Sequence, residues 1–176
     1  MESDKKQIKY PYLPEGQKIL YVPKDNKFML RAKEVAHGSN EQQQPTGVVV
    51  VHNDKVVSED SNINPLSNRR LIDLHQKYCI RHILKIPSGD KYWLCPGCAK
   101  KEDHAEHRAI KKLLKNKTTN GPFDLYLWGH WWCCDVCWDS MMKLPIRNVY
   151  LLENSEILFN LKNPRHIVGN GRQFDR

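Results

Sequence analysis

Two short segments constrain this chain more than any other feature of its sequence. The first is His104-Ala105-Glu106, and the second contains Cys134 and Cys137 with two residues between them. A histidine and a C-x-x-C pair supply three ligands that zinc prefers, and a fourth position left to water is typical of catalytic zinc sites. Glu106 is left over, and a carboxylate beside a zinc-bound water can shuttle protons. The pattern predicts a catalytic zinc site; a closed structural zinc site, which needs no free Glu106, is the alternative.

A third cysteine raises a question of register in the second segment. Cys133 directly precedes Cys134, but only Cys134 and Cys137 have the two-residue spacing of a C-x-x-C pair. We therefore predict that Cys134 and Cys137 are the ligands and that Cys133 is a packed or spare thiol. Both ligand segments open helical patterns, and a helix N-terminus lowers the pKa of a thiol placed there.

Residues 65–103 form a connection that is too long to be ordered without a cause of its own. It contains Cys79 and His82 in a C-x-x-H pair, and Cys95 and Cys98 in a C-x-x-C pair. Two such pairs joined by a hairpin are typical of a small zinc knuckle with three cysteine ligands and one histidine ligand. We predict a second, structural zinc that stabilises an insertion with little core of its own.

The fourth ligand of this second site is open to alternatives. His75 and His107 compete with His82 for the position. The cysteines could also be buried thiols, with His82 unrelated to them. The hairpin between the two pairs would turn at residues 87–90, where Pro, Ser, Gly and Asp follow one another.

The hydrophobic pattern predicts helices that alternate with strands. Valine-rich runs on both sides of an Asn-Asp turn predict a β-hairpin whose first strand is buried on both faces. Asp25 or Asn26 would cap the first helix, and Gly38 would end it. The expected helices are 28–36, 105–115 and 134–144, and the expected strands are 47–51, 56–59, 123–128 and 149–152. Helices would therefore cover both faces of an α/β sheet.

Length and composition favour one domain. With 176 residues, the chain is long enough for one compact core. We place an extended arm at residues 1–24, in which residues 19–22 dock or pair, and a single domain at 25–176 with the insertion at about 65–103. No apolar run approaches a membrane span, and the N-terminus lacks a signal peptide. We expect a cytoplasmic protein, because six cysteines are better explained by metal than by disulfides there.

The net charge of +8 allows two interpretations. A basic surface attracts nucleic acid or the phosphate of a nucleotide. The other interpretation is a solvated lysine surface, which we favour because the lysines are spread along the chain.

The H-A-E segment followed by C-x-x-C resembles the cytidine and deoxycytidylate deaminase superfamily, in which the glutamate is not a zinc ligand. The Pro-Thr-Gly step at 45–47 fits the start of that family's first strand, and the insertion before H-A-E is closest to deoxycytidylate deaminases. Cys133 departs from the pattern, because the family has a proline there. The resemblance implies a three-layer α/β/α cytidine deaminase-like fold with a mixed central sheet, here with a zinc-knuckle insertion.

The resemblance also implies the chemistry. It implies a zinc-dependent hydrolase that acts on the C–N bond of a cyclic amidine, with zinc hydroxide attacking the amine-bearing ring carbon and Glu106 shuttling protons. Asn62 would contact the substrate sugar, although Asp-Ser-Asn replaces the usual Gly-aromatic-Asn and Asn64 is a rival. The backbone N–H of Ala105 and the carbonyl near Trp132 would bind the base.

Aromatic residues crowd the approach to the second segment. Trp131 or Trp132 would form a wall against which a base stacks, whereas Trp128 is expected in the core. His130 could reach a phosphate, or it could simply be hydrogen-bonded.

A free pyrimidine nucleotide or nucleoside, similar to dCMP or CMP, is the first choice of substrate. A base in RNA or single-stranded DNA is the second choice, and a zinc-stabilised binding module without turnover is the alternative from another class. Another amine-bearing heterocycle is not excluded. No membrane partner is expected, and the resemblance allows a homo-oligomer.

Overall fold

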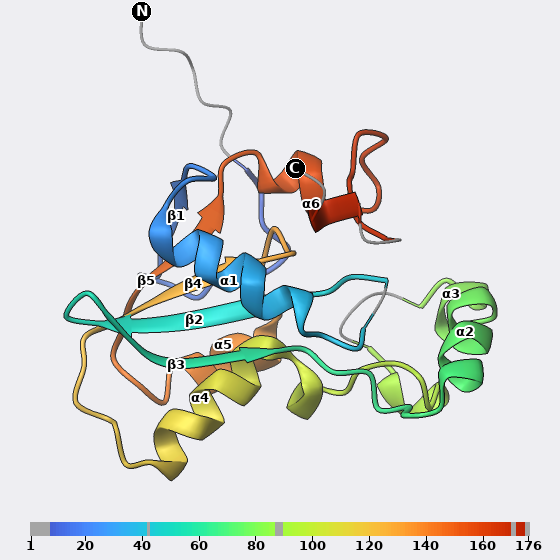
Figure 1. Ribbon diagram of the computed structural model, residues 1–176, viewed down its shortest axis with the longest axis horizontal. Coiled ribbons are helices and arrows are strands. Elements are labelled where there is room, and N and C mark those ends of the chain that lie inside the picture. Colours follow the sequence, from blue (N-terminus) through green and yellow to red (C-terminus); the bar gives the residue numbers. More distant parts are fainter. Residues whose placement is uncertain (1–7, 42, 87–89, 170–171, 175–176) are drawn as a thin grey trace, which may run out of the picture.

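The computed structural model describes residues 8–41, 43–86, 90–169 and 172–174. Five strands form one mixed sheet in the order β1-β5-β4-β2-β3 (Figure 1). Their bounds are β1 Ile19–Val22, β2 Gly47–His52, β3 Lys55–Ser61, β4 Phe123–Trp128 and β5 Ile146–Leu152. β5 runs parallel to β1 and β4, whereas β2 runs antiparallel to β3 and β4. The predicted α/β class and mixed sheet are confirmed.

The valine run of β2 shows why helices must cover both faces of the sheet. Side chains alternate between the faces of a strand, so Val48 and Val50 enter one buried cluster, and Val49 and Val51 enter another. Helices α4 (Ala105–Lys115) and α5 (Asp135–Met141) cover the first face, and α1 (Lys27–His37) and α6 (Ser155–Phe159) cover the second (Figure 1). The predicted three layers are therefore present.

The helix boundaries follow local capping. The side chain of Asn26 accepts hydrogen bonds from the backbone N–H groups of Phe28 and Met29, so Asn26 rather than Asp25 caps α1. Gly38 ends this helix, as predicted. The helix expected at 105–115 has those bounds, whereas α5 is shorter than the predicted 134–144.

The segment expected to dock or pair near the N-terminus does pair. β1 lies beside β5, with Ile19 opposite Val149 and Val22 opposite Leu152. Of the extended arm predicted at 1–24, residues 1–7 lie outside the described part of the chain.

The insertion at about 65–103 forms an arm of its own, distinct from the N-terminal segment, that stands off the end of the sheet (Figure 1). It contains helices α2 (Arg69–Lys77) and α3 (Ile80–Ile83) and the 3₁₀ turn η1 (Tyr92–Leu94), and the turn η2 (Lys101–Asp103) leads back to α4. The hairpin predicted between the two ligand pairs is wrong, because the described residues on that stretch form helical turns instead of strands. Residues 87–89 of its predicted turn lie outside the described part.

The arm has very little hydrophobic core. Its buried cluster consists of Cys79, Cys95 and Cys98 with Tyr92 packed against them, and Ile72 is also buried. Three sulfurs cannot replace the apolar surface that normally stabilises a folded segment. The order of the arm must therefore depend on a group that links those sulfurs, such as a shared metal ion.

Within the described residues, no helix has both the length and the apolar character needed to cross a bilayer.

Gly47 allows α1 to lie against the sheet. A Cβ atom at this position would lie 2.2 Å from the backbone oxygen of Ala32 and 2.4 Å from the backbone nitrogen of Ala36. We predict that Gly47→Ala lowers the free energy of unfolding by about 1–3 kcal/mol, because the helix must shift to relieve the overlap. Denaturant unfolding measures the change. The control is Gly38→Ala, whose Cβ would meet only Val35 O, at 3.4 Å; equal midpoints for the two variants would contradict the account.

Candidate active site

His104, Cys134 and Cys137 converge on one point. The Nδ1 atom of His104 lies 3.3 Å from the sulfur of Cys137 and 3.5 Å from the sulfur of Cys134. A tetrahedral zinc ion with ordinary bond lengths holds a sulfur and a nitrogen ligand about 3.6 Å apart. The donor set and its spacing therefore fit zinc, and the three side chains form one of the two metal-ligand groups among the described residues.

Two helix N-termini bring these ligands together. His104 is the N-cap residue of α4, and Cys134 is the N-cap residue of α5. Both have extended backbone angles, and their carbonyl groups accept hydrogen bonds from the first helical turn, Arg108 to His104 and Trp138 to Cys134. The positive ends of the two helix dipoles therefore point at the ligand group, where they stabilise thiolates.

Hydrogen bonds within this group determine which side chain carries a proton. The Cys137 side chain lowers the pKa of Cys134 to about 5, against the effect of burial, and His104 lowers it further. The pKa of Cys137 is raised well above its usual value, because it keeps the proton shared with Cys134 and because it is buried. Burial lowers the pKa of His104, but its contacts with Cys134 and Glu106 outweigh this effect and raise it. A zinc ion would displace these protons on binding.

Glu106 lies in the first turn of α4, next to the ligand group but outside it. Its exposed fraction is only 6%. Burial raises the pKa of its carboxyl group, and the charge of Cys134 raises it further. A buried carboxyl with a raised pKa is suited to accept and return protons near neutral pH.

Cys133 is separate from the ligands. Its side chain is fully buried in the cluster on the α4 and α5 face, and burial raises the pKa of its thiol well above the usual value. The geometry therefore joins Cys134 with Cys137, in the register that the spacing favours, and places Cys133 in the core.

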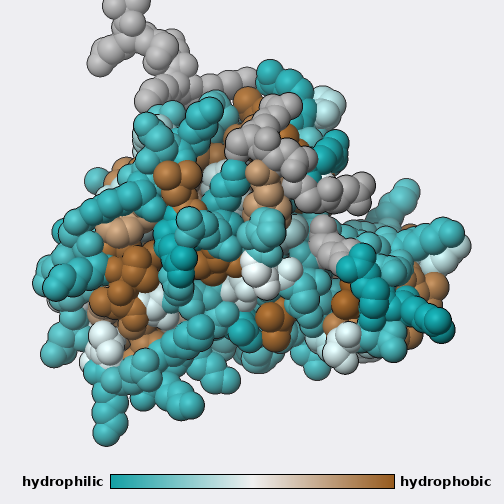
Figure 2. Space-filling view, viewed as in Figure 1, coloured by the Kyte–Doolittle hydropathy of each residue, from teal (hydrophilic) through white to brown (hydrophobic). Residues whose placement is uncertain are grey.

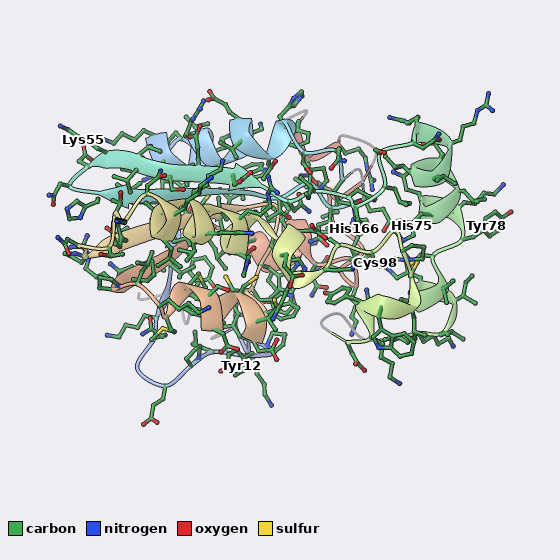
Figure 3. The ribbon with its side chains drawn as sticks, turned by 90° about the horizontal axis from the view of Figure 1, so that it is seen from below. Tyr12, Lys55, His75, Tyr78, Cys98 and His166 are labelled. Carbon is green, nitrogen blue, oxygen red and sulfur yellow. The ribbon has the colours of Figure 1, made fainter. Side chains whose placement is uncertain are left out.

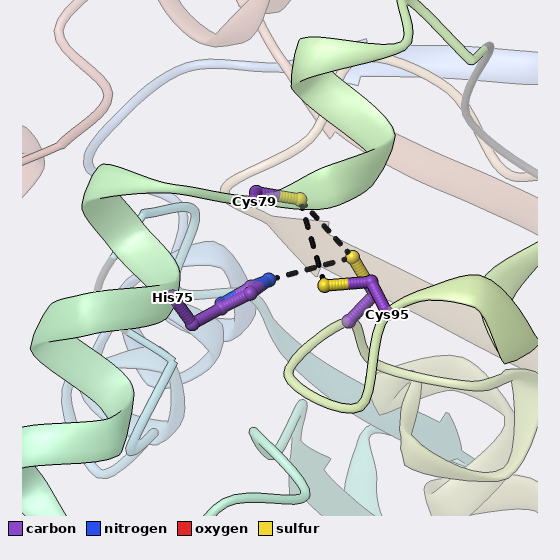
Figure 4. Close-up of side chains that lie close together, drawn as sticks. His75, Cys79 and Cys95 are labelled. Carbon is purple, nitrogen blue, oxygen red and sulfur yellow. Dashed lines mark hydrogen bonds between the residues drawn. The ribbon is translucent and has the colours of Figure 1, made fainter.

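Four side chains of the arm form a second candidate metal-ligand group (Figure 4). The sulfur of Cys98 lies 3.5 Å from the sulfur of Cys79 and 3.5 Å from Nε2 of His75. The sulfurs of Cys79 and Cys95 are 4.0 Å apart. A tetrahedral zinc ion holds two sulfur ligands about 3.8 Å apart, so the four donors fit a structural zinc site of the predicted Cys3His type.

The histidine of this second group is His75 and not the predicted His82. His75 lies in the last turn of α2, four residues before Cys79, so the short link between α2 and α3 brings the two side chains together. His82 lies inside α3, and its side chain is exposed and faces the pocket described below. The other rival, His107, is hydrogen-bonded to Ser140 Oγ at 2.7 Å.

One further feature favours His75. A Cβ atom on Gly97 would lie 2.3 Å from the His75 ring, so the glycine between the two cysteines makes room for the imidazole. Figure 3 shows His75 and Cys98 where the arm joins the rest of the protein. His75 and Cys79 do not share a helix, because α2 ends at Lys77 and Cys79 is the N-cap residue of α3, so no helical spacing marks this pair in the sequence.

Arg81 places a positive charge beside the second group. Its exposed fraction is 6%, and its guanidinium lies 4.1 Å from the centre of the Tyr92 ring. Burial raises the pKa of Cys98 to about 12, and the contact with Arg81 works in the opposite direction. A zinc ion held by three thiolates and one imidazole would leave the site with a net negative charge, which Arg81 would offset.

One pocket connects the two ligand groups. His75, Cys79 and Cys98 line one side, and His104, Glu106 and Cys134 line the other. The three predicted substrate contacts, Asn62, Ala105 and Trp132, also line it, together with His130. The structure thus gathers the predicted residues of the first site around a single cavity, except Cys137, which is fully buried behind it; whether they bind substrate stays a prediction.

The side chain of Asn62 is already engaged with the pocket wall. Its Oδ1 accepts a hydrogen bond from the backbone N–H of Thr46 at 2.8 Å, and its Nδ2 donates to the carbonyl of Gln44 at 3.0 Å. The rival, Asn64, is buried and donates to Glu41. Asn62 therefore shapes the wall, whatever contact it makes with a ligand.

Several residues that line the pocket were not predicted from the sequence. Glu41, Gln43 and Gln44 lie between α1 and β2, and Arg81 and Tyr92 belong to the arm. No spacing pattern in the sequence marks them, because tertiary packing alone brings them to the site. Trp131 does not line the pocket; its ring stacks on Tyr10 at 6.3 Å.

The comparison with known families agrees with this geometry. The family model of the cytidine and deoxycytidylate deaminase zinc-binding region matches residues 22–153, which is most of the chain. The chain therefore belongs to this family, a family of zinc-dependent deaminases that hydrolyse C–N bonds. The search of curated proteins finds no match.

The correction from His82 to His75 is testable with the two metal sites. We predict that His75→Ala lowers the bound zinc from two ions to one per chain, because it removes a ligand of the second group. His82→Ala, the matched control, should keep two ions. Elemental analysis of the purified proteins measures zinc per chain, and loss of zinc from the His82 variant alone would reverse the assignment.

His130 should make stability depend on pH. Burial lowers the pKa of His130 to about 4, and the charge of His104 lowers it further. The unfolded chain takes up this proton near pH 6.5, but the folded protein does not until about pH 4, so stability falls as the pH falls through that window.

We expect the variant His130→Asn to lose less stability than the wild type between about pH 7 and pH 5. Asparagine keeps an acceptor for the backbone N–H of Trp131, which lies 3.2 Å from His130 Nδ1. Thermal melts across that range measure the difference. Parallel pH profiles for the two proteins would show that His130 does not contribute.

Proposed function

We propose that this chain is a zinc-dependent hydrolytic deaminase of a free pyrimidine nucleotide or nucleoside, with a dCMP-like or CMP-like substrate as first choice. The observation that carries the proposal is the position of Glu106. It is a buried carboxyl with a raised pKa, beside a three-ligand group and in the same pocket, yet outside the group itself. A structural zinc site is closed by four protein ligands and needs no free carboxyl group beside it.

Each residue of the first site has a role in this chemistry. His104, Cys134 and Cys137 would hold the zinc ion, which when bound supplies a Lewis acid that acidifies a water molecule. Glu106 takes a proton from the attacking water and gives a proton to the ring nitrogen beside the reacting carbon. It then takes the remaining proton of the added hydroxyl and delivers it to the amine, so that ammonia leaves and a carbonyl remains on the ring.

The pocket wall would hold the base in register with Glu106. The backbone N–H of Ala105, at the start of α4, is one of the unpaired donors of a helix N-terminus and is suited to bind the base carbonyl. The Trp132 ring lines the pocket, where a base can stack, and its carbonyl would accept from the amine. Asn62, fixed by Thr46 and Gln44, would meet the sugar.

The second group would hold a structural zinc ion. His75, Cys79, Cys95 and Cys98 would join α2, α3 and the loop after η1, and so fix one wall of the pocket. Because both sites need reduced thiols, and all six cysteines are free, a reducing compartment such as the cytoplasm belongs to this proposal. A homo-oligomer is compatible with it.

Ammonia release from a panel of nucleobases, nucleosides and nucleotides tests the proposal. We expect turnover of dCMP or CMP by the zinc-loaded protein. We also expect Glu106→Gln to reduce turnover by about 10²–10⁴-fold while the fold and both zinc ions are retained, because the amide cannot carry protons.

Two outcomes would contradict the proposal. Full activity of Glu106→Gln would remove the proton shuttle from the account. No ammonia from any pyrimidine in the panel, with two zinc ions bound, would favour a binding module without turnover.

A further inference from the structure

The arm exposes large apolar side chains to an unusual degree. Trp93 is 77% exposed, Ile83 is 65% exposed, and five others on α2, α3 and their junction are between 43% and 59% exposed: Leu71, Leu74, Tyr78, Ile80 and Leu84. A large side chain has roughly 200 Å² of surface, so the seven together expose roughly 800 Å². Patches of this size on a single chain usually mark an interaction surface.

The same arm carries half of the net charge of the protein, +4 of +8 over residues 65–103. Its exposed basic residues are Arg69, Arg70, Lys77, Lys85, Lys91, Lys100 and Lys101, whereas its acidic residues are Asp73, Asp90, Glu102 and Asp103. Asp73 is paired with Arg69 at 2.9 Å. Figure 2 shows hydrophobic and hydrophilic residues side by side at the end of the molecule where α2 and α3 lie, and in Figure 3 Tyr78 points away from the rest of the protein.

Charge decides what kind of partner fits. Two copies of this arm would repel each other, since like charges would meet across the interface. A partner with regularly spaced negative charges and flat apolar groups complements both features. Single-stranded nucleic acid has this chemistry, because basic side chains follow its phosphates and exposed aromatic rings stack on its bases.

The arm surface is continuous with the pocket. Arg81 and His82 of α3 and Tyr92 of η1 line the pocket, while their chain neighbours Ile80, Ile83 and Trp93 are exposed on the arm. α3 and η1 therefore lie beside any nucleotide in the pocket, because both elements contribute residues to its wall. The surface that is apolar and basic is the surface that flanking nucleotides would meet.

We propose that the arm binds single-stranded nucleic acid, so that a base within a strand, and not only a free nucleotide, can enter the pocket. This inference rests on the proposed deaminase function for the pocket itself. Trp93 is the stacking platform, and Lys85 and Lys91, on either side of the α3–η1 connection, contact phosphates.

Binding to a fluorescent single-stranded deoxyoligonucleotide of thymidines tests the proposal without any turnover. We expect Trp93→Ala to weaken binding at least about tenfold, because stacking on one exposed ring is lost. We expect the double variant K85Q/K91Q to lower the slope of log K against log salt by about 1.4, since each lost phosphate contact removes about 0.7 for a single strand. Both variants should keep two zinc ions per chain.

Matched controls come from the opposite end of the sheet, where Lys55 lies far from the arm in Figure 3. Val56, 41% exposed in β3, is the apolar control, and Lys55 is the basic control. Val56→Ala and Lys55→Gln should bind the oligonucleotide as the wild type does. Equal weakening by Lys55→Gln would show that binding follows net charge, and equal weakening by Val56→Ala would show that the loss is not specific to Trp93; either result would overturn the proposal.

Turnover separates this inference from the proposed function. On an oligonucleotide with a single cytosine, Trp93→Ala should raise KM about tenfold, and on free CMP or dCMP it should change nothing. If the free nucleotide is deaminated but the oligonucleotide neither binds nor reacts, the proposed function stands and the arm proposal fails. Binding to anionic phospholipid vesicles or self-association that is lost in Trp93→Ala, without oligonucleotide binding, would overturn it as well.

Discussion

The meeting of two helix N-termini at one point is the constraint on which the site depends. α4 and α5 pack on the same face of the sheet, and their N-cap residues, His104 and Cys134, are the positions at which the chain leaves extended backbone and enters a helix. The helix dipoles favour thiolates at that point, and the first turn of α4 places Glu106 beside it. The core that holds the two helices, including Trp138 and Leu113, therefore also sets the geometry of the metal ligands.

The arm follows a different physical principle. It has almost no apolar core, so its fold depends on His75 and three cysteines that are suited to share one metal ion. Three of these residues, His75, Cys79 and Cys98, line the pocket that contains Glu106. If a metal ion occupies this group, its loss would remove a wall of the pocket as well as the stability of the arm, although none of the arm residues needs to take part in the proton transfers.

The sequence predicted the elements in which local signals agree. The valine run of β2, the periodicity of residues 105–115 and the spacing from Cys134 to Cys137 each have one reasonable interpretation, and the structure shows the sheet, α4 and the first ligand group accordingly. The arm was predicted less well, because a C-x-x-H pair looks like a ligand pair even where the histidine lies inside a short helix and faces elsewhere. The choice between His75 and His82 depends on how α2 meets α3, and the pocket walls from Glu41 and Arg81 depend on packing between segments far apart in the chain.

Crystals of the zinc-loaded protein, measured at the zinc absorption edge, test the central claim most directly. The account predicts an anomalous peak within bonding distance of His104, Cys134 and Cys137, with the carboxylate of Glu106 next to the ion but outside its coordination sphere. An absence of zinc at this point, or an ion that is coordinated by Glu106 or by Cys133, would contradict it.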